Sequence, residues 1–123
     1  MGEYLYKDLT QQIIGCAFRV FKELGYGYRE KVYQRGLAEE FGCLNLSFKK
    51  ELPVRIYYKN KLIAKYYLDF IIENKVVVEL KVAADFYTKD IKQLLSYLKA
   101  NNCRLGLLLI VTKRGIKCKR VIN

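Results

Sequence analysis

Three charged residues interrupt two neighbouring apolar runs near the middle of the chain, and their types could do chemistry together. Asp69 lies in residues 66–72, and Glu79 and Lys81 lie in residues 76–83. Charged groups in a buried apolar segment are costly unless they are paired or bound to a metal ion. Magnesium is usually held by one or two carboxylates, with waters and phosphate oxygens completing its coordination. The residue types are therefore those of a cation site with a lysine beside it.

The spacing of these residues predicts a β-hairpin that brings them together. Glu73-Asn74-Lys75 is a polar turn between two apolar arms. Pairs centred on Asn74 place Asp69 opposite Glu79, and Lys81 shares a face with Glu79. Like charges in opposed positions destabilise a sheet by about 0.2–1 kcal/mol, and a divalent cation would offset their repulsion. In the alternative interpretation the three charges face solvent on an edge hairpin, and the pattern leaves both open.

The rest of the chain supplies elements that could position this hairpin. Apolar residues at helical spacing predict helices over residues 8–24, 28–41 and 88–100, and apolar or alternating runs predict strands over 48–58, 62–72, 76–82, 105–112 and 117–122. Asp8 or Thr10 is expected to cap the first helix, Gly42 to end the second and Thr88 to cap the third. This order predicts a single α/β domain over residues 1–123, with a mixed central β-sheet of about five strands flanked by three helices.

The charge balance points to a polyanionic partner. The 123 residues carry a net charge of +11 and no histidine. Such a basic surface favours nucleic acid, bound mainly without sequence preference. The candidate contacts are the basic residues of strands and turns, most of which we expect to be ordinary solvated charges: Lys49, Lys50, Lys59, Lys61, Lys113, Arg114, Lys117, Lys119 and Arg120.

Cysteine usage and the absence of long apolar runs bear on the cellular location. The four cysteines form no CxxC pair, so we expect reduced thiols, with a four-cysteine iron–sulfur site as the alternative. No run approaches membrane-spanning length, and residues 1–12 do not resemble a signal peptide. These features predict a cytoplasmic protein with no membrane association.

Four motifs resemble those of a known nuclease superfamily, and in chain order they are GxxExxY, D, ExK and QxxxY. Asp69, followed by Glu79-Leu80-Lys81, resembles the D…ExK signature of the PD-(D/E)xK nucleases, with Leu68 at the place of the eponymous proline. Gly27-Tyr28-Arg29-Glu30-Lys31-Val32-Tyr33 is similar to the motif of the GxxExxY proteins, a branch of that superfamily. Gln93-Leu94-Leu95-Ser96-Tyr97 resembles the QxxxY motif of RecB-like and Cas4-like nucleases. The resemblance covers nearly the whole chain.

The resemblance implies a restriction-endonuclease-like core and metal-dependent hydrolysis of phosphodiester bonds. Its catalytic residues would be Asp69, Glu79 and Lys81, with Lys81 orienting or activating the attacking water. Mg²⁺ or Mn²⁺ would be held by Glu30, Asp69 and Glu79, while Gln93 and Tyr97 would support the site or touch the DNA backbone. Many relatives have a histidine three residues before the glutamine, where this chain has Asp90.

Three functions compete at this point. The first is a metal-dependent nuclease acting on DNA, which Lys117, Lys119 and Arg120 in the last predicted strand would contact. The second is a non-catalytic nucleic-acid-binding module on the same fold, and the third is an assembly subunit. Intact Asp69, Glu79 and Lys81 favour the nuclease, because a retired site would lose its costly charges. A chain this small offers little surface for gripping a duplex, which favours a homodimer or a larger complex.

Overall fold

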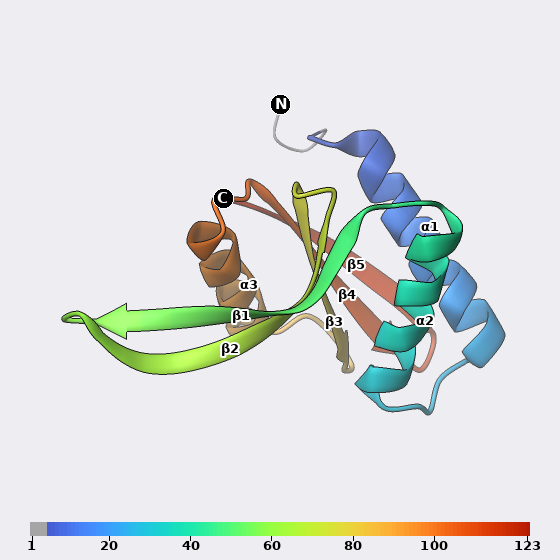
Figure 1. Ribbon diagram of the computed structural model, residues 1–123. Helices are drawn as coiled ribbons and strands as arrows, with labels where there is room; N and C mark the ends of the chain where they lie inside the picture. Colours follow the sequence, from blue (N-terminus) through green and yellow to red (C-terminus); the bar gives the residue numbers. More distant parts are fainter. Residues whose placement is uncertain (1–4) are drawn as a thin grey trace.

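The sheet is built from five strands in sequence order. The computed structural model describes residues 5–123, and their elements are α1 (Lys7–Leu24), α2 (Glu30–Cys43), β1 (Phe48–Tyr58), β2 (Lys61–Ile72), β3 (Val76–Val82), α3 (Thr88–Ala100), β4 (Leu105–Thr112) and β5 (Gly115–Ile122). The strands lie in the order β1-β2-β3-β4-β5 (Figure 1). All neighbours are antiparallel except β3 and β4, which are parallel and joined by α3. The predicted mixed sheet with three helices is confirmed.

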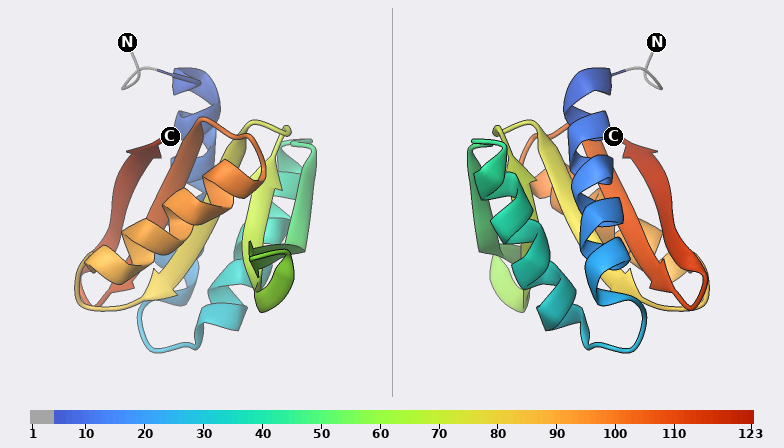
Figure 2. Two further views of the ribbon diagram at one scale, coloured as in Figure 1. Left: turned by 90° about the vertical axis from the view of Figure 1, so that its left-hand side faces the viewer. Right: turned by 90° about the vertical axis from the view of Figure 1, so that its right-hand side faces the viewer.

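The helices cover the two faces of the sheet separately. Figure 2 shows α3 on one face and α1 with α2 on the other. Val76, Val78 and Leu80 of β3 pack with α1 and α2, whereas Val77 packs with α3. Strand β4 is buried at every position, as expected for a central strand covered on both faces. The layers thus form one apolar core on each side of β3 and β4.

The β1–β2 hairpin changes direction part of the way along its length. Phe48 and Phe70 pack on the α1–α2 side of the sheet, whereas Leu52 and Leu68 pack on the α3 side. Regular alternation would keep Phe48 and Leu52 of β1 on one face, and likewise Phe70 and Leu68 of β2. The reversal falls at Glu51, whose backbone is left-handed with φ 55°. Residues 53–67 then form a two-stranded arm, whose base still packs on the α3 side through Val54 and Ile56 and whose outer part projects from the body (Figure 1).

Helix ends differ from the sequence expectations. Helix α2 begins at Glu30 and continues through Gly42 to Cys43. The residue before α1 is Tyr6 and the residue before α3 is Tyr87, and no side chain caps either helix. Asp8, Thr10 and Thr88 are therefore not caps; Thr10 instead donates its hydroxyl to the Lys7 carbonyl inside α1. None of the described helices is long and apolar enough to cross a membrane.

Candidate active site

Strand β2 separates from β3 at Asp69, and carboxylates take over the hydrogen bonds of the broken ladder. The turn of residues 73–75 sets the expected register centred on Asn74, but the β2–β3 pairs stop at Phe70 and Val78. Beyond that pair the Asp69 amide donates to Glu79 Oε1 at 2.8 Å, and the Leu80 amide donates to Asp69 Oδ2 at 2.8 Å. The two acidic side chains therefore meet in the gap between the strands.

Helix α2 brings two further polar side chains to this gap. Gln34 Nε2 donates to Asp69 Oδ1 at 2.9 Å, and Glu30 Oε2 accepts the Val82 amide at 3.3 Å. Glu30 and Gln34 are four residues apart and so share one face of the helix. Sequence reasoning named Glu30 but missed Gln34, for which this spacing was the available signal.

Burial makes both carboxyl groups reluctant to ionise, and the charge of Asp69 adds to this effect at Glu79. Burial, followed by the Asp69 charge, raises the pKa of Glu79 to about 8. Burial also raises the pKa of Asp69 to about 6, against the opposing effects of the Leu80 amide and the Lys81 charge. The charge of Glu30 raises both pKa values further. The gap therefore favours an added positive charge.

Lys81 and two residues of α3, Gln93 and Tyr97, were predicted near the same gap, and they differ in burial and in their interactions. Lys81 is half-buried, and its charge lowers both carboxyl pKa values although it joins none of the described ion pairs. Tyr97 is buried, and burial together with the charges of Glu79 and Asp69 raises its pKa, so its hydroxyl stays protonated. Gln93 lies one turn earlier in α3, and its side chain makes no hydrogen bond with the described residues.

The donor chemistry suits a hard divalent cation, with two carboxylates as its basis. Among residues 5–123 no three acidic or cysteine side chains form a ready-made metal cluster, so the predicted trio of Glu30, Asp69 and Glu79 is not assembled as one. Mg²⁺ needs only one or two carboxylates when waters and phosphate oxygens supply the rest. The other carboxylate oxygen of Glu79, Oε2, accepts no hydrogen bond from residues 5–123. Asp69 and Glu79 therefore fit such an ion.

A basic hollow opens beside Asp69, between α2 and the base of the arm. Its volume is about 120 Å³, and it is lined by Lys31, Gln34, Arg35, Lys50, Glu51, Asp69 and Phe70. An adjoining hollow also includes Tyr67 and Leu68. Lys50 was among the predicted contacts, but Arg35 was missed because its position on α2 relative to β1 depends on the tertiary fold. The hollow places three positive side chains beside Asp69, of which Lys31 is ion-paired with Glu51 at 2.6 Å and Arg35 and Lys50 join none of the described ion pairs.

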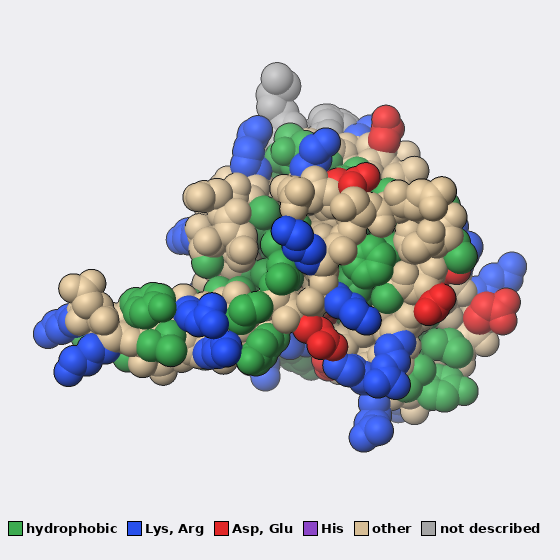
Figure 3. Space-filling model, viewed as in Figure 1, with side chains coloured by type: hydrophobic (Ala, Val, Ile, Leu, Met, Phe, Trp, Pro, Cys, Tyr) green, Lys and Arg blue, Asp and Glu red, His purple; other side chains and the backbone are tan. Residues whose placement is uncertain are grey.

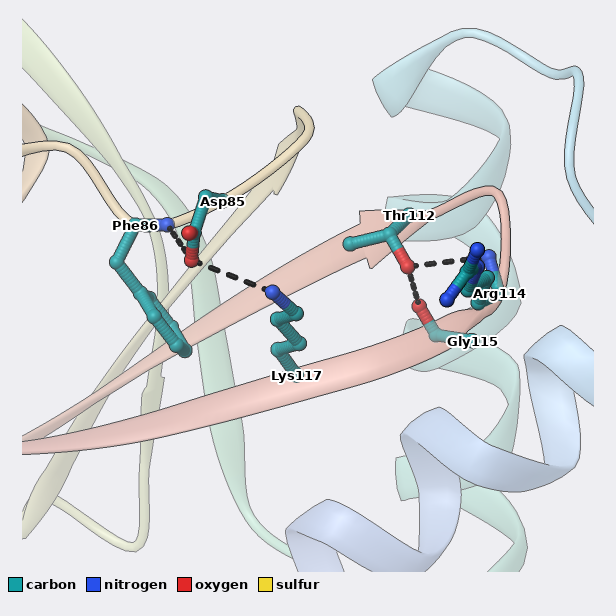
Figure 4. A network of polar contacts seen from close by, with 6 residues as sticks. All are labelled: Asp85, Phe86, Thr112, Arg114, Gly115 and Lys117. Carbon is teal, nitrogen blue, oxygen red and sulfur yellow. Dashed lines mark hydrogen bonds and ion pairs between the residues drawn. The ribbon is translucent and has the colours of Figure 1, made fainter.

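The basic residues predicted in β5 interact mainly with the protein itself. Lys117 forms an ion pair with Asp85 at 3.3 Å (Figure 4), and the Lys119 ammonium lies 5.7 Å from the ring centroid of Phe86. Arg120 donates to Thr10 Oγ1 at 3.0 Å and to the Leu5 carbonyl at 2.7 Å, which ties α1 to β5. Contacts from these three residues to DNA stay predictions.

Comparisons with solved structures agree on the fold. SSO0001 matches with a TM-score of 0.60 and 22% identity, over 76% of this chain and 49% of its own, so the present chain spans about half its length. The alkaline exonuclease LHK-Exo from Laribacter hongkongensis matches with a TM-score of 0.51 and 10% identity, over 93% of this chain and 82% of its own. The fold is therefore restriction-endonuclease-like, as predicted.

Sequence comparison assigns the family. A search of curated protein sequences gave no match. The sequence profile of the PD-(D/E)XK nuclease superfamily matches residues 7–121, which include all the motif residues and every element from α1 to β5 except the last residue of β5. The chain therefore belongs to the PD-(D/E)XK nuclease superfamily.

Proposed function

We propose that this protein is a metal-dependent nuclease that hydrolyses phosphodiester bonds in DNA. The observation that carries the proposal is the pair of Asp69 and Glu79, which share the gap where β2 leaves β3 and whose charges repel each other there. A bound Mg²⁺ or Mn²⁺ would relieve this repulsion. Membership of the superfamily supports the same chemistry.

Each residue around the gap has a role in this proposal. Asp69 and Glu79 would hold the metal ion, which when bound supplies charge neutralisation at the phosphate and a more acidic water. Gln34 holds Asp69 in place through its amide, and Glu30 fixes the end of β3 through the Val82 amide. Lys81, which has no carboxylate partner in the described ion pairs, is the group that would face the attacking water or the phosphate. Tyr97 would act as a neutral hydroxyl donor.

The surface around the gap supports a nucleic-acid substrate. Lys31, Arg35 and Lys50 line the hollow next to Asp69, and positive side chains gather phosphates without reading sequence. The small chain favours action as a homodimer or within a larger complex when the substrate is a duplex.

Single-turnover cleavage tests the proposal. Plasmid, linear and single-stranded DNA are incubated with Mg²⁺, Mn²⁺ or EDTA, with the parent beside Lys81→Ala and Glu79→Ala. Lys81→Ala is expected to bind DNA as the parent does but to cleave it about 10²–10⁴-fold more slowly, because its interaction is made mainly in the transition state. Glu79→Ala should lose both cleavage and metal binding, which also shows that no contaminating nuclease is present. Equal cleavage by the parent and Lys81→Ala would rule out the role given to Lys81.

A second candidate is a non-catalytic nucleic-acid-binding or assembly module. It is favoured by the hydrogen bonds that Asp69 and Glu79 already make to backbone amides, because these alone close the gap between β2 and β3. In that case Lys81→Ala would weaken binding modestly, and the parent would cleave no substrate with either metal. The cleavage series above separates the two functions.

A further inference from the structure

The projecting arm carries an unusual combination of exposed rings and positive charge. Its charged residues, all basic, are Arg55, Lys59, Lys61 and Lys65. Its exposed large apolar side chains are Tyr57, Tyr58, Leu62, Ile63, Tyr66 and Tyr67. Figure 3 shows hydrophobic and basic side chains along the arm and no acidic ones. An exposed apolar surface of this kind marks an interaction site.

One face of the arm concentrates these features in a stripe. The register shift between Ile56 and Tyr57 adds a residue to β2 and none to β1, so alternation along β1 still puts Arg55 and Tyr57 on one face. Arg55 pairs directly with Lys65 of β2. Tyr67 lies two residues from Lys65 on that same face, and the Lys65 ammonium is 5.4 Å from its ring centroid. We call Arg55, Tyr57, Lys65 and Tyr67 the stacking face. Directly opposed positive charges destabilise a hairpin, so the Arg55–Lys65 pair indicates an anionic ligand.

The stacking face leads into the candidate active site. Tyr67 lines the hollow that also contains Gln34 and Asp69. Tyr67 pairs with Pro53, and Tyr57 lies four residues further out along β1. Tyr57 and Tyr67 are therefore separated by about 13 Å along the strand direction. A bound chain lying on this face would therefore be aimed at the carboxylates.

Charge complementarity identifies the occupant as a polyanion and argues against a second copy of the protein. Two arms placed together would combine two groups of four positive charges with no acid between them. Pro53, which has no amide hydrogen, and Arg55 also make β1 a poor edge for strand pairing. Nucleic acid supplies both the phosphates for the lysines and the bases for the rings.

We propose that the stacking face binds the unpaired bases of a single-stranded nucleic acid and guides that strand to Asp69 and Glu79. Aromatic side chains stack on bases of any sequence, and nearby basic groups follow the backbone. In a duplex the bases already stack on one another, so the rings would gain little. This inference rests on the proposed nuclease function and adds the substrate class.

Binding measured in EDTA tests the inference without any cleavage. The probe is a fluorescently labelled oligothymidylate about 15 nucleotides long, which fits the site sizes of single-strand binders, compared with a duplex of equal length. Tyr57→Ala and Tyr58→Ala form a matched pair, because the side chains are 61% and 62% exposed and alternate faces of β1. Tyr57→Ala should weaken single-strand binding about 5- to 100-fold, the range for a lost base stack. Tyr58→Ala should change it by less than about twofold, and duplex affinity should be the same for both variants.

Equal single-strand affinity for the two variants would overturn the inference, and so would an equal loss of duplex binding by Tyr57→Ala. A dimer seen by light scattering that Tyr57→Ala dissociates, with unchanged nucleic-acid affinity, would overturn it in favour of a second copy. The nuclease proposal fails separately. A parent that cleaves nothing but still loses single-strand binding on Tyr57→Ala contradicts the nuclease and supports the stacking face.

Discussion

Asp69 and Glu79 have two roles that make opposite demands on their environment. As acceptors for the Leu80 and Asp69 amides they complete the backbone where β2 leaves β3. As buried acids they repel each other, and both have pKa values above their usual range. The hydrogen bonds to the amides do not require acids, because neutral side chains could accept them as well. The repulsion between the two acids is offset by no cation among the described contacts. The acids are therefore better explained by a cation site than by structure alone.

The raised pKa values predict how stability depends on pH in the absence of metal. At these two carboxyl groups the folded state binds protons more tightly than the unfolded state. The stability that they contribute is therefore fully present at low pH and is lost as the pH rises through about 6 for Asp69 and about 8 for Glu79. Asp69→Asn should therefore melt at a higher temperature than the parent at pH 8–9, and the difference should vanish toward pH 4. Gln34 can rotate its amide to suit the new side chain, so the hydrogen bond is retained. Thermal melts of both proteins in EDTA across this range measure the effect.

Added Mg²⁺ provides the control for this prediction. Mg²⁺ should raise the melting temperature of the parent at pH 8 and raise that of Asp69→Asn less, since a ligand stabilises the state that binds it. A variant that melts well below the parent at every pH would instead show that Asp69 is required for the fold.

At the scale of elements, close packing of α3 on the sheet decides where Tyr97 lies. A Cβ added to Gly106 of β4 would come within 2.8 Å of Leu94 Cδ1 and 3.0 Å of its Cγ. Leu94 is fully buried and cannot swing out. Gly106 therefore allows α3 to approach β4 closely. At this distance the charges of Glu79 and Asp69 raise the pKa of Tyr97.

Gly106→Ala is accordingly expected to lower both stability and cleavage. Overpacking a buried site costs about 1–3 kcal/mol of unfolding free energy, and a displaced α3 would move Tyr97. Gly42→Ala in α2 is the matched control, because a Cβ there meets no atom within 4 Å and alanine favours a helix by about 1 kcal/mol over glycine. Denaturant unfolding of the two variants should give changes of opposite sign. Equal stability of Gly106→Ala and the parent would show that the helix shifts freely.

The sequence predicted elements better than it predicted their ends and their bends. Phe48–Tyr58, Thr88–Ala100 and Leu105–Thr112 have the expected bounds, because polar or turn residues flank each of these segments. The change of face at Glu51 was missed, although the charged run Lys49-Lys50-Glu51 interrupts the alternating pattern of β1 at that point. The bend lies across the hairpin from Asp69, where β2 leaves β3.

The sequence also predicted only part of the candidate site. Motif spacing singled out Asp69, Glu79 and Lys81, and the structure brings the two acids together with Lys81 near enough to lower their pKa values. Gln34 and Arg35 escaped notice because a glutamine or arginine on a helix surface is ordinary until the fold places it against a strand. Side chains that act across elements are therefore the part that pattern reasoning missed.

At the scale of the whole molecule, the net charge of +11 is spread over surfaces that differ in their distance from the site. Lys50 lines the hollow beside Asp69, at one edge of the sheet. Lys119 lies on β5 at the other edge, with its ammonium over Phe86. A substrate that enters this hollow lies against Lys50, whereas it need not touch Lys119.

Salt-dependent binding distinguishes these two surfaces. For single-stranded DNA in EDTA, Lys50→Ala should weaken affinity and reduce the slope of log affinity against log salt by about 0.7, the value for one lost phosphate contact on a single strand. Lys119→Ala removes the same charge from the chain, so it controls for the general effect of net charge, and its slope should match that of the parent. The opposite result, with a smaller slope only for Lys119→Ala, would place the DNA along β5, as its basic residues suggested from sequence. Because both variants lose one positive charge, any difference between their slopes reports where the strand lies.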